Sequence, residues 1–511
     1  MNFDRESAVS AKTRSSTRAS HRQQLTLFLV AALALSQSLA PLGAQQAEPQ
    51  PHAAQQPGAN QQKPGAQLET GTTSGLSTDV RLQNLLADHQ YLLIASQLGE
   101  LPPGQAQFYR GILANRSNDL EESIKLLEPL ADQVAQSGNF AHEKLLRKAL
   151  AEDYLRLGEW NKAAAAYQAL DARLKDKLTS DEQDEIEMPL RLLPLAKDNP
   201  HTTAEPCDPF KLQVSGDPLG LIDVPVFVDA RSRNWMLDPT LPFNLIARST
   251  VRDAGLPISG ASATITTLTG RPIQIRSTII PRFTIGGRLT LRNMTAFVYD
   301  DKDYYFPRTS YQVEGILGYP ALAAIGSLTV NSDDTIFIRP AKQIAPPEKD
   351  DQLTTGARFY LDGDQVIVAL GRARTTAEGP PAQQTAGAAG PGISAASEDD
   401  ERMYAVDAGG QQTYLTSRYF DENAAEFNSQ KMEMYSFLGS QSPPQPAYTA
   451  ENVPLQVGDA TITLHFIHVL TQPLGPAALD DVYGVLGTDA LGQLKSYTFD
   501  YRTMRFSATV E

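Results

Sequence analysis

The sequence predicts an N-terminal α-helical domain followed by two homologous, mainly β domains. Three observations predict this α+β multidomain architecture. Apolar residues recur every three or four positions up to about residue 199, and every second position from about residue 212. The second half of the chain also contains a gapless internal duplication. The length of 511 residues is enough for several domains, because one domain usually takes about 100–200 residues.

The first 44 residues have the pattern of a secretory signal peptide. Five basic residues precede an apolar run at residues 25–35, and small residues follow it up to Ala44. This run is shorter than the ~20 apolar residues that a transmembrane helix needs. We therefore expect an exported protein, periplasmic or secreted, with no membrane span after cleavage; an uncleaved N-terminal anchor is the alternative. Residues 45–78 are rich in Gln, Pro, Gly and Ala and are expected to form a disordered linker.

The composition argues against several classes of function. With 44 Lys and Arg against 59 Asp and Glu, the formal net charge is −15, and removing the five basic and two acidic residues of the signal peptide makes it −18. Such a chain is not expected to bind nucleic acid, whose phosphates require basic partners. Cys207 is the single cysteine, which excludes an intramolecular disulfide and a multi-cysteine metal site. His465 and His468 are three residues apart in a predicted strand and should face opposite sides. We expect neither a metal ion nor another cofactor.

Residues 81–199 are predicted to form helical hairpins. Residues 108–131 and residues 150–170 each contain an apolar helix, a tight turn and a second helix, and the turns fall at Asn118 and Gly158. Small residues lie where each second helix must approach the first one closely, namely Ser123 and Ala163.

This helical pattern resembles the tetratricopeptide repeat. The two turns are 40 residues apart, whereas the usual period of that repeat is about 34, and an insertion around residues 136–142 would explain the difference. The resemblance implies a concave surface that binds a peptide or a protein partner. A plain α-helical spacer is the alternative.

Two β lobes are predicted, one in residues 211–340 and one in residues 353–511. The sequence GILGYPALAAIGSLTVNSDDTIFI, which starts at Gly315, aligns without gaps to GVLGTDALGQLKSYTFDYRTMRFS, which starts at Gly484. Two Gly-centred hairpin signals, FTIGGRLTL and LQVGDATITL, precede these segments. A low-complexity tract at residues 375–401 is expected to be a disordered insert in the second lobe.

One aspartate follows a short apolar strand in each lobe. These are Asp238 in WMLDPTLPFNLI and Asp407 in YAVDAGGQQTYL. The separation in sequence from Asp238 to Gly315 is the same as that from Asp407 to Gly484. The equal spacing indicates that the two aspartates occupy equivalent places in homologous lobes.

An aspartate directly after a strand, with an apolar-apolar-Gly segment farther along the same lobe, resembles one lobe of a retropepsin-like aspartic peptidase. The apolar-apolar-Gly segments here are ILG, ending at Gly318, and VLG, ending at Gly487. The resemblance implies that Asp238 and Asp407 meet at the lobe interface and share a proton. One carboxylate would then activate a water molecule while the other donates to the peptide carbonyl. It also implies an extended peptide substrate, held in the cleft by strand-like hydrogen bonds.

Both aspartate loops depart from the Asp-Thr-Gly or Asp-Ser-Gly sequence of that family. Pro239 removes a backbone donor and the hydroxyl that braces the loops, and Thr240 stands in place of a glycine. In the second loop Ala408 lacks the bracing hydroxyl, whereas Gly409 is kept. The Thr240 hydroxyl can compensate in the first loop. Two functions stay open: an exported aspartic endopeptidase whose helical module captures a substrate or partner, and a catalytically inactive module that binds peptides or proteins in the same cleft.

Overall fold

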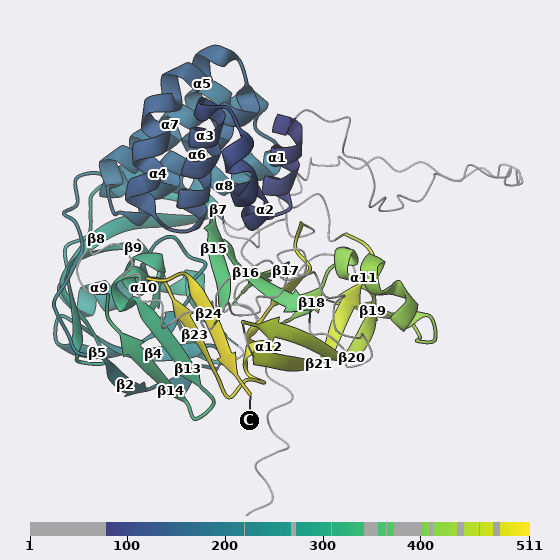
Figure 1. Ribbon diagram of the computed structural model, residues 1–511. Helices are drawn as coiled ribbons and strands as arrows, with labels where there is room; N and C mark the ends of the chain where they lie inside the picture. Colours follow the sequence, from purple (N-terminus) through teal and green to yellow (C-terminus); the bar gives the residue numbers. More distant parts are fainter. Residues whose placement is uncertain are drawn as a thin grey trace, which may run out of the picture.

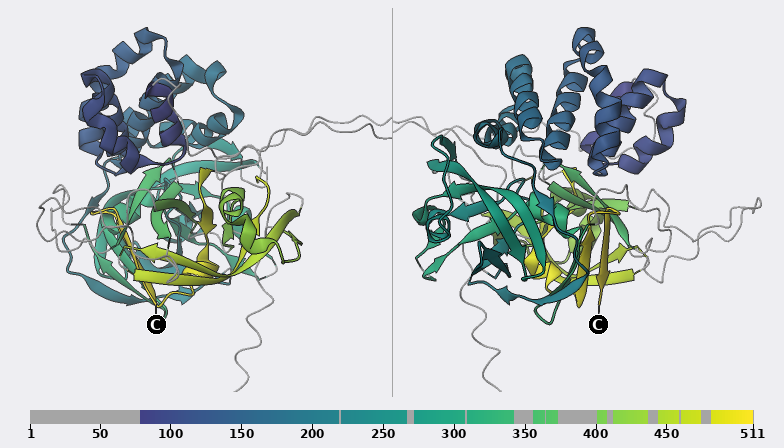
Figure 2. Two further views of the ribbon diagram at one scale, coloured as in Figure 1. Left: turned by 45° about the vertical axis from the view of Figure 1, so that its right-hand side comes forward. Right: turned by 90° about the vertical axis from the view of Figure 1, so that its left-hand side faces the viewer.

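A helical domain lies on top of two β lobes (Figures 1 and 2). None of the described helices is both long and apolar enough to cross a membrane. The predicted signal peptide, the predicted linker up to residue 77 and nearly all of the predicted insert lie outside the residues described. The computed structural model describes residues 78–510, except for residues 219, 267–271, 308, 342–355, 364, 373–400, 408–411, 437–443, 459 and 474–480.

The helical domain begins at Thr78, slightly before the predicted boundary at residue 81. Asn118 and Gly158 lie in the turns after α3 and α6 with φ of 58° and 72°, a region that asparagine and glycine tolerate best. Its helices are α1 (Thr78–Ala87), α2 (Tyr91–Gln97), α3 (Pro103–Arg116), α4 (Leu120–Leu127), α5 (Ala131–Ser137), α6 (Phe140–Arg156), α7 (Trp160–Leu174) and α8 (Ser180–Ala196).

The two predicted hairpins are α3–α4 and α6–α7. Ser123 and Ala163, the small residues predicted at the helix contacts, are both completely buried. Helix α3 approaches α4 so closely that a Cβ on Gly111 would lie 2.5 Å from Leu127. The short helix α5 lies between the hairpins and lengthens their spacing. The helical hairpins are therefore confirmed, and their assignment to the tetratricopeptide repeat stays a prediction.

Lobe 1 is built around a nine-stranded sheet. Its elements are β1 (Thr203–Ala204), β2 (Phe210–Gln213), β3 (Ser215–Gly216), β4 (Ile222–Val228), β5 (Arg231–Leu237), β6 (Leu245–Ala247), α9 (Arg248–Asp253), β7 (Ala263–Thr266), β8 (Pro272–Ile285), β9 (Leu289–Tyr299), β10 (Tyr305–Phe306), β11 (Tyr311–Gln312), β12 (Gly315–Leu317), α10 (Tyr319–Ile325), β13 (Ser327–Asn331) and β14 (Thr335–Arg339).

Lobe 2 repeats the order of elements from β4 to β14, apart from β10 and β11, which have no counterpart among its described residues. Its elements are β15 (Ala357–Asp362), β16 (Gln365–Arg372), β17 (Glu401–Val406), β18 (Tyr414–Leu415), α11 (Ser417–Asn423), β19 (Glu433–Tyr435), β20 (Gln445–Val457), β21 (Ala460–Leu470), β22 (Gly484–Leu486), α12 (Thr488–Leu491), β23 (Ser496–Asp500) and β24 (Arg505–Thr509). The two predicted hairpin signals form the β8–β9 and β20–β21 hairpins.

The strands that carry the aspartates and the apolar-apolar-Gly segments correspond at one offset in sequence, the one that relates Asp238 to Asp407, whereas the β8–β9 and β20–β21 hairpins between them do not share it. Strand β12 pairs in parallel with β5, and β22 pairs in parallel with β17. Each of β12 and β22 also pairs antiparallel with the short strand that follows the aspartate loop, β6 or β18. The duplication seen in the sequence is therefore a duplication of strand topology.

A pseudo-two-fold axis passes between β13 and β23, which join the lobes into one sheet. Thr329 pairs with Thr498, its own equivalent at this offset, and their hydroxyl oxygens are 2.8 Å apart. The pairing is symmetric about this point, because Ser327 pairs with Asp500 and Asn331 pairs with Ser496. Two homologous lobes related by such an axis agree with the aspartic-peptidase-like fold that the sequence predicts.

Candidate active site

The fold places Asp238 and Asp407 at equivalent strand ends. The backbone N–H of Asp238 donates to the carbonyl of Leu317 at 3.0 Å, and that of Asp407 donates to the carbonyl of Leu486 at 3.0 Å. Each bond extends the parallel pairing of the preceding strand by one residue. The backbone of each aspartate is therefore fixed by the apolar-apolar-Gly segment of its own lobe.

The glycines of these segments are supported differently in the two lobes. The N–H of Gly318 donates to Asn244 Oδ1 at 3.1 Å, whereas the N–H of Gly487 donates to Thr413 Oγ1 at 2.8 Å. Asn244 and Thr413 are equivalent positions at the offset that relates the lobes. A Cβ on Gly318 would lie 2.1 Å from the carbonyl oxygen of Phe243, so that only glycine fits there.

Asp238 is completely buried and held by its own loop. Thr240 donates to Asp238 Oδ1 twice, from its hydroxyl at 2.6 Å and from its backbone N–H at 3.0 Å. Thr240 thus supplies the hydroxyl that Pro239 cannot. Asp238 Oδ2 has no hydrogen-bond partner among the residues described.

Burial raises the pKa of Asp238, and the hydrogen bonds from Thr240 and Leu241 offset only part of this effect. The carboxyl group therefore holds its proton more readily than an exposed aspartate. Asp238 in turn raises the pKa of buried Tyr501, which belongs to lobe 2, although burial is the larger cause. A protonated Asp238 could donate from its carboxyl group, as one member of the predicted dyad must.

Asp407 is half-buried, unlike Asp238. Ala408 and Gly409, predicted to complete its loop, lie outside the described residues. The meeting of the two carboxyl groups therefore stays a prediction.

The helical domain contacts lobe 1 beside the candidate site. The Tyr319 hydroxyl donates to Asn118 Oδ1 at 2.9 Å, and the backbone N–H of Tyr319 donates to the carbonyl of Leu241 in the Asp238 loop. Helix α8 packs near β7 and β8, where Ser277 donates to the carbonyl of Leu195 at 2.6 Å. The turn after α3 is thus connected to the first aspartate loop through Tyr319.

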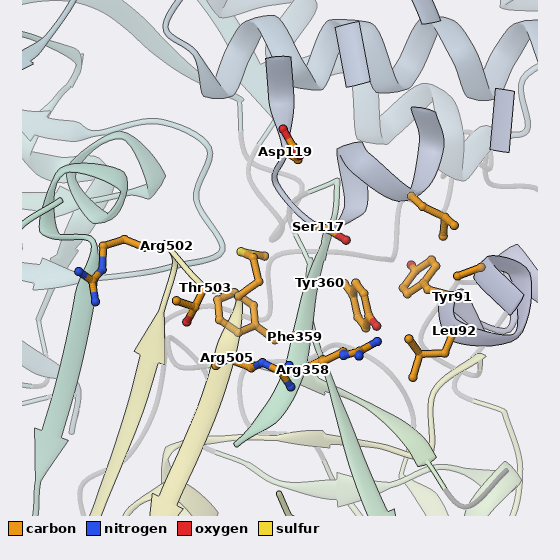
Figure 3. Close-up of a pocket in the computed structure, with 13 residues that line it drawn as sticks. Tyr91, Leu92, Ser117, Asp119, Arg358, Phe359, Tyr360, Arg502, Thr503 and Arg505 are labelled. Carbon is orange, nitrogen blue, oxygen red and sulfur yellow. The ribbon is translucent and has the colours of Figure 1, made fainter. Parts of the chain in front are cut away.

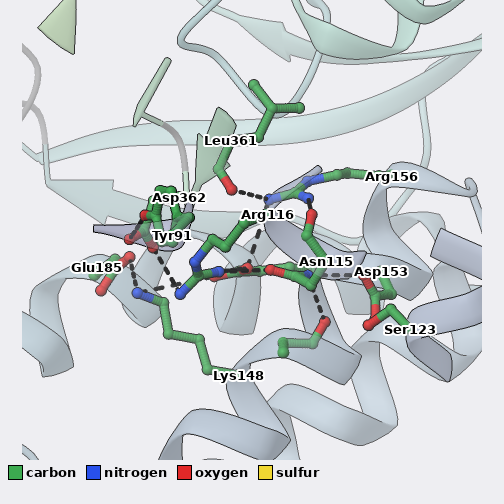
Figure 4. Close-up of polar contacts among 12 residues, drawn as sticks. Tyr91, Asn115, Arg116, Ser123, Lys148, Asp153, Arg156, Glu185, Leu361 and Asp362 are labelled. Atoms are coloured by element: carbon green, nitrogen blue, oxygen red, sulfur yellow. Dashed lines mark hydrogen bonds and ion pairs between the residues drawn. The ribbon is translucent and has the colours of Figure 1, made fainter. Parts of the chain in front are cut away.

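The helical domain holds lobe 2 through a half-buried carboxylate, Asp362 (Figure 4). Asp362, at the β15–β16 turn, lies 2.8 Å from Arg116 Nη2, and it also accepts a hydrogen bond from the Tyr91 hydroxyl at 3.1 Å. The Arg116 side chain is 5% exposed, and it also forms an ion pair with Glu152 at 3.1 Å and donates to Asn115 Oδ1 at 2.5 Å. Burial raises the pKa of Asp362, but the charge of Arg116, supported by His89 and Lys148, outweighs burial and holds this pKa well below its usual range.

The β15–β16 turn, which carries Asp362, lies next to the second aspartate loop. Val366 of β16 pairs with Val406 of β17, the residue directly before Asp407. The helical domain therefore supports both candidate loops, one through a hydrogen bond to Tyr319 and one through the ion pair to Asp362.

The sequence analysis missed a carboxylate cluster in lobe 1. Tyr311 donates to both oxygens of Asp223 at 3.3 Å, and Asp217 is near both residues. Burial, with the charge of Asp217, raises the pKa of Asp223 to about 7. The signal available in the sequence was an aspartate inside an apolar strand, IDVPVFV, where a buried charge is unexpected.

No group of three or more His, Cys, Asp and Glu side chains that could hold a metal ion occurs among the described residues. His465, one of the two histidines considered in the sequence, has a structural contact instead, since its backbone N–H donates to Gln493 Oε1 at 2.9 Å.

Comparison with known proteins supports an aspartic-protease-like fold. Residues 224–321 match the sequence family described as Aspartyl protease. This match spans the Asp238 loop, Gly318 and the strands between them. No curated protein matches the chain.

Several solved structures are similar to parts of the chain at low identity. A retropepsin-like aspartic protease from Rickettsia conorii shows 14% identity and a TM-score of 0.20, covering 25% of this chain and 98% of its own. Basic 7S globulin from soybean shows 9% identity and a TM-score of 0.34, covering 60% of this chain and 95% of its own. Conglutin gamma from lupine seeds shows 9% identity and a TM-score of 0.35, covering 60% of this chain and 96% of its own.

Proposed function

We propose that this protein is an exported aspartic endopeptidase that hydrolyses peptide bonds with Asp238 and Asp407. The observation that carries the proposal is the equivalence of the two aspartates, which follow matching strands and donate matching backbone bonds on the two sides of the pseudo-two-fold axis. The family match over residues 224–321 supports the same chemistry.

The proposed reaction divides the work between the two carboxyl groups. The raised pKa of Asp238 favours its protonated form, which would donate a hydrogen bond to the substrate carbonyl. Asp407 would act as the carboxylate that takes a proton from the attacking water. Activity should therefore be greatest in acid and fall as Asp238 ionises.

The test is cleavage of an unfolded protein, such as reduced and alkylated casein, by the mature chain from acid to neutral pH. Asp238→Asn and Asp407→Asn should each abolish turnover, whereas Asp333→Asn, an exposed aspartate in the β13–β14 turn, should leave it unchanged. The double change Pro239→Thr and Thr240→Gly should raise the rate, because it restores the family loop. Unchanged cleavage by both Asn variants would remove these aspartates from the mechanism.

One observation favours a second function, peptide binding without catalysis. Asp238 is completely buried, so a substrate carbonyl reaches it only if the surrounding loops move. A wild-type chain that binds peptides but cleaves none at any pH between acid and neutral would assign the protein to this binding class. Export would be tested separately, by N-terminal sequencing of the purified protein, which should begin near Gln45.

A further inference from the structure

A pocket lies between the helical domain and lobe 2 (Figure 3). Its volume is about 400 Å³. Helices α2 and α3 contribute apolar residues, including Leu92 and Leu113, and lobe 2 contributes β15, β24 and the turn before β24. The pocket is therefore formed by two domains and would not exist in either domain alone.

Two arginines stand opposite each other at the base of this pocket. Arg358 of β15 pairs with Arg505 of β24 in the antiparallel ladder, and Figure 3 shows their side chains next to each other. Like charges directly opposite in a ladder destabilise a sheet. Burial lowers the pKa of Arg505, and the charge of Arg358 lowers it further.

Neither arginine is neutralised by a neighbouring carboxylate. Within the part of the chain that the structure describes, no Asp or Glu oxygen lies within 4.0 Å of Arg358 or Arg505; Glu401 attracts Arg505 only from farther away. The third arginine of the pocket, Arg502, differs because it is paired with Asp500 at 2.8 Å.

A buried hydroxyl points to the same place. Tyr360 is 5% exposed, and its hydroxyl donates no hydrogen bond to a described residue. Burial raises the pKa of Tyr360, and Arg358 offsets part of this effect through its charge and a side-chain hydrogen bond. In Figure 3 this hydroxyl is directed toward the Arg358 guanidinium. A buried O–H group that donates to nothing carries a desolvation penalty, which an acceptor bound in the pocket would relieve.

We propose that this pocket binds a small organic anion, with a carboxylate or phosphate between Arg358 and Arg505 and an apolar body against Leu92 and Met504. Arginine forks match the paired oxygens of both anionic groups. The anion would remove the repulsion between the two guanidinium groups and accept from the Tyr360 hydroxyl. The acidic residue of the pocket, Asp119, lies at the opposite rim in Figure 3 and leaves the arginine end positive.

The proposal does not depend on peptidase activity and is tested by titration calorimetry on the intact mature chain. The probes are N-acetyl-phenylalanine, its uncharged amide, and phenyl phosphate. We expect the two anions to bind and the amide to bind at least tenfold more weakly, since it lacks the charge that the arginines recognise. The stronger of the two anions decides between a carboxylate and a phosphate ligand.

Three variants locate the binding site. Arg358→Gln changes an exposed side chain and should weaken anion binding about tenfold or more, whereas Arg231→Gln, an exposed arginine of lobe 1, makes the same change in net charge and should have no effect. Leu92→Trp should block binding while both arginines remain. Equal binding of the amide, equal binding by Arg358→Gln, or no binding of either anion to the folded wild type would overturn the proposal.

Discussion

The two lobes share one topology but stabilise their aspartate loops by different means. In lobe 1 the loop is closed by Thr240 and Asn244, and Asp238 is sealed from solvent. In lobe 2 the equivalent support is Thr413, which is itself held by Asp489, and Asp407 is half-buried. The duplicated strands therefore fix where the aspartates stand, whereas the residues around them have diverged.

The two lobes should differ most in the stability that is lost when their equivalent glycines, Gly315 and Gly484, are replaced by alanine. A Cβ on Gly315 would lie 2.2 Å from the ring of Trp235, which is completely buried, so Gly315→Ala should destabilise the protein by at least about 3 kcal/mol. A Cβ on Gly484 would lie 2.7 Å from a Leu415 methyl group, which can rotate away, and 2.8 Å from the backbone carbonyl oxygen of Tyr414, which cannot. Gly484→Ala should therefore cost about 2 kcal/mol, less than Gly315→Ala because the overlap is smaller.

Urea denaturation measures both glycine variants. Gly104→Ala is the control, since nothing lies within 4 Å of a Cβ there. Equal losses at the two equivalent glycines would mean that the lobes are packed alike, contrary to this comparison.

The Asp362–Arg116 contact with lobe 2 should contribute more to stability than the Tyr319–Asn118 contact with lobe 1. Asp362→Asn removes one carboxylate from buried Arg116 and should lower the free energy of unfolding by about 3 kcal/mol at neutral pH. Tyr319→Phe removes one hydrogen bond to Asn118 and should cost only about 1 kcal/mol.

The dependence of stability on pH tests whether the charge of Asp362 causes the stability loss in Asp362→Asn. Because its pKa is lowered in the folded state, its stabilising effect is present above the pKa of the unfolded chain and is lost as the pH falls. The stability gap between wild type and Asp362→Asn should therefore narrow in acid, while the gap for Tyr319→Phe should not. A gap for Asp362→Asn that stays constant with pH would contradict the ion-pair explanation.

The sequence was sufficient to predict the repeated topology, because the same offset relates β5 to β17 and β12 to β22, and each lobe has a hairpin signal between these strands. It also located Asp238 and Asp407 at strand ends, since the apolar pattern marks where each strand stops. It could not predict that the turn at Asp362 docks onto Arg116, because these residues are far apart in the chain and local patterns carry no information on such contacts. The Asp223 cluster was missed for the same reason: its partner Tyr311 is 88 positions away.

Removing the Thr413 hydroxyl in lobe 2 should have a smaller effect on stability. Thr413→Val leaves the buried N–H of Gly487 without its acceptor and should cost about 1–3 kcal/mol. Thr413→Ser keeps the hydroxyl and should recover most of that loss. Urea denaturation of the two variants separates hydrogen bonding from packing, because an equally destabilised Ser variant would assign the effect to the lost methyl group.

The smallest expected effect on stability concerns Asp238, and it is measured from how the stability of the protein depends on pH. Since the pKa of Asp238 is raised in the folded state, its neutral form is compatible with burial, and stability is lost as the pH rises through that pKa. Asp238→Asn cannot ionise, so its stability relative to wild type should increase from acid to neutral pH.

Thr240→Val should show the opposite trend: its stability relative to wild type should decrease from acid to neutral pH. This variant removes the hydroxyl that favours the ionised carboxylate of Asp238, and so makes ionisation in the folded state still less favourable. Urea denaturation of wild type and both variants across this pH range tests the assignment. Parallel curves for all three proteins would show that Asp238 titrates alike in the folded and unfolded chain, and burial would then not raise its pKa in lobe 1.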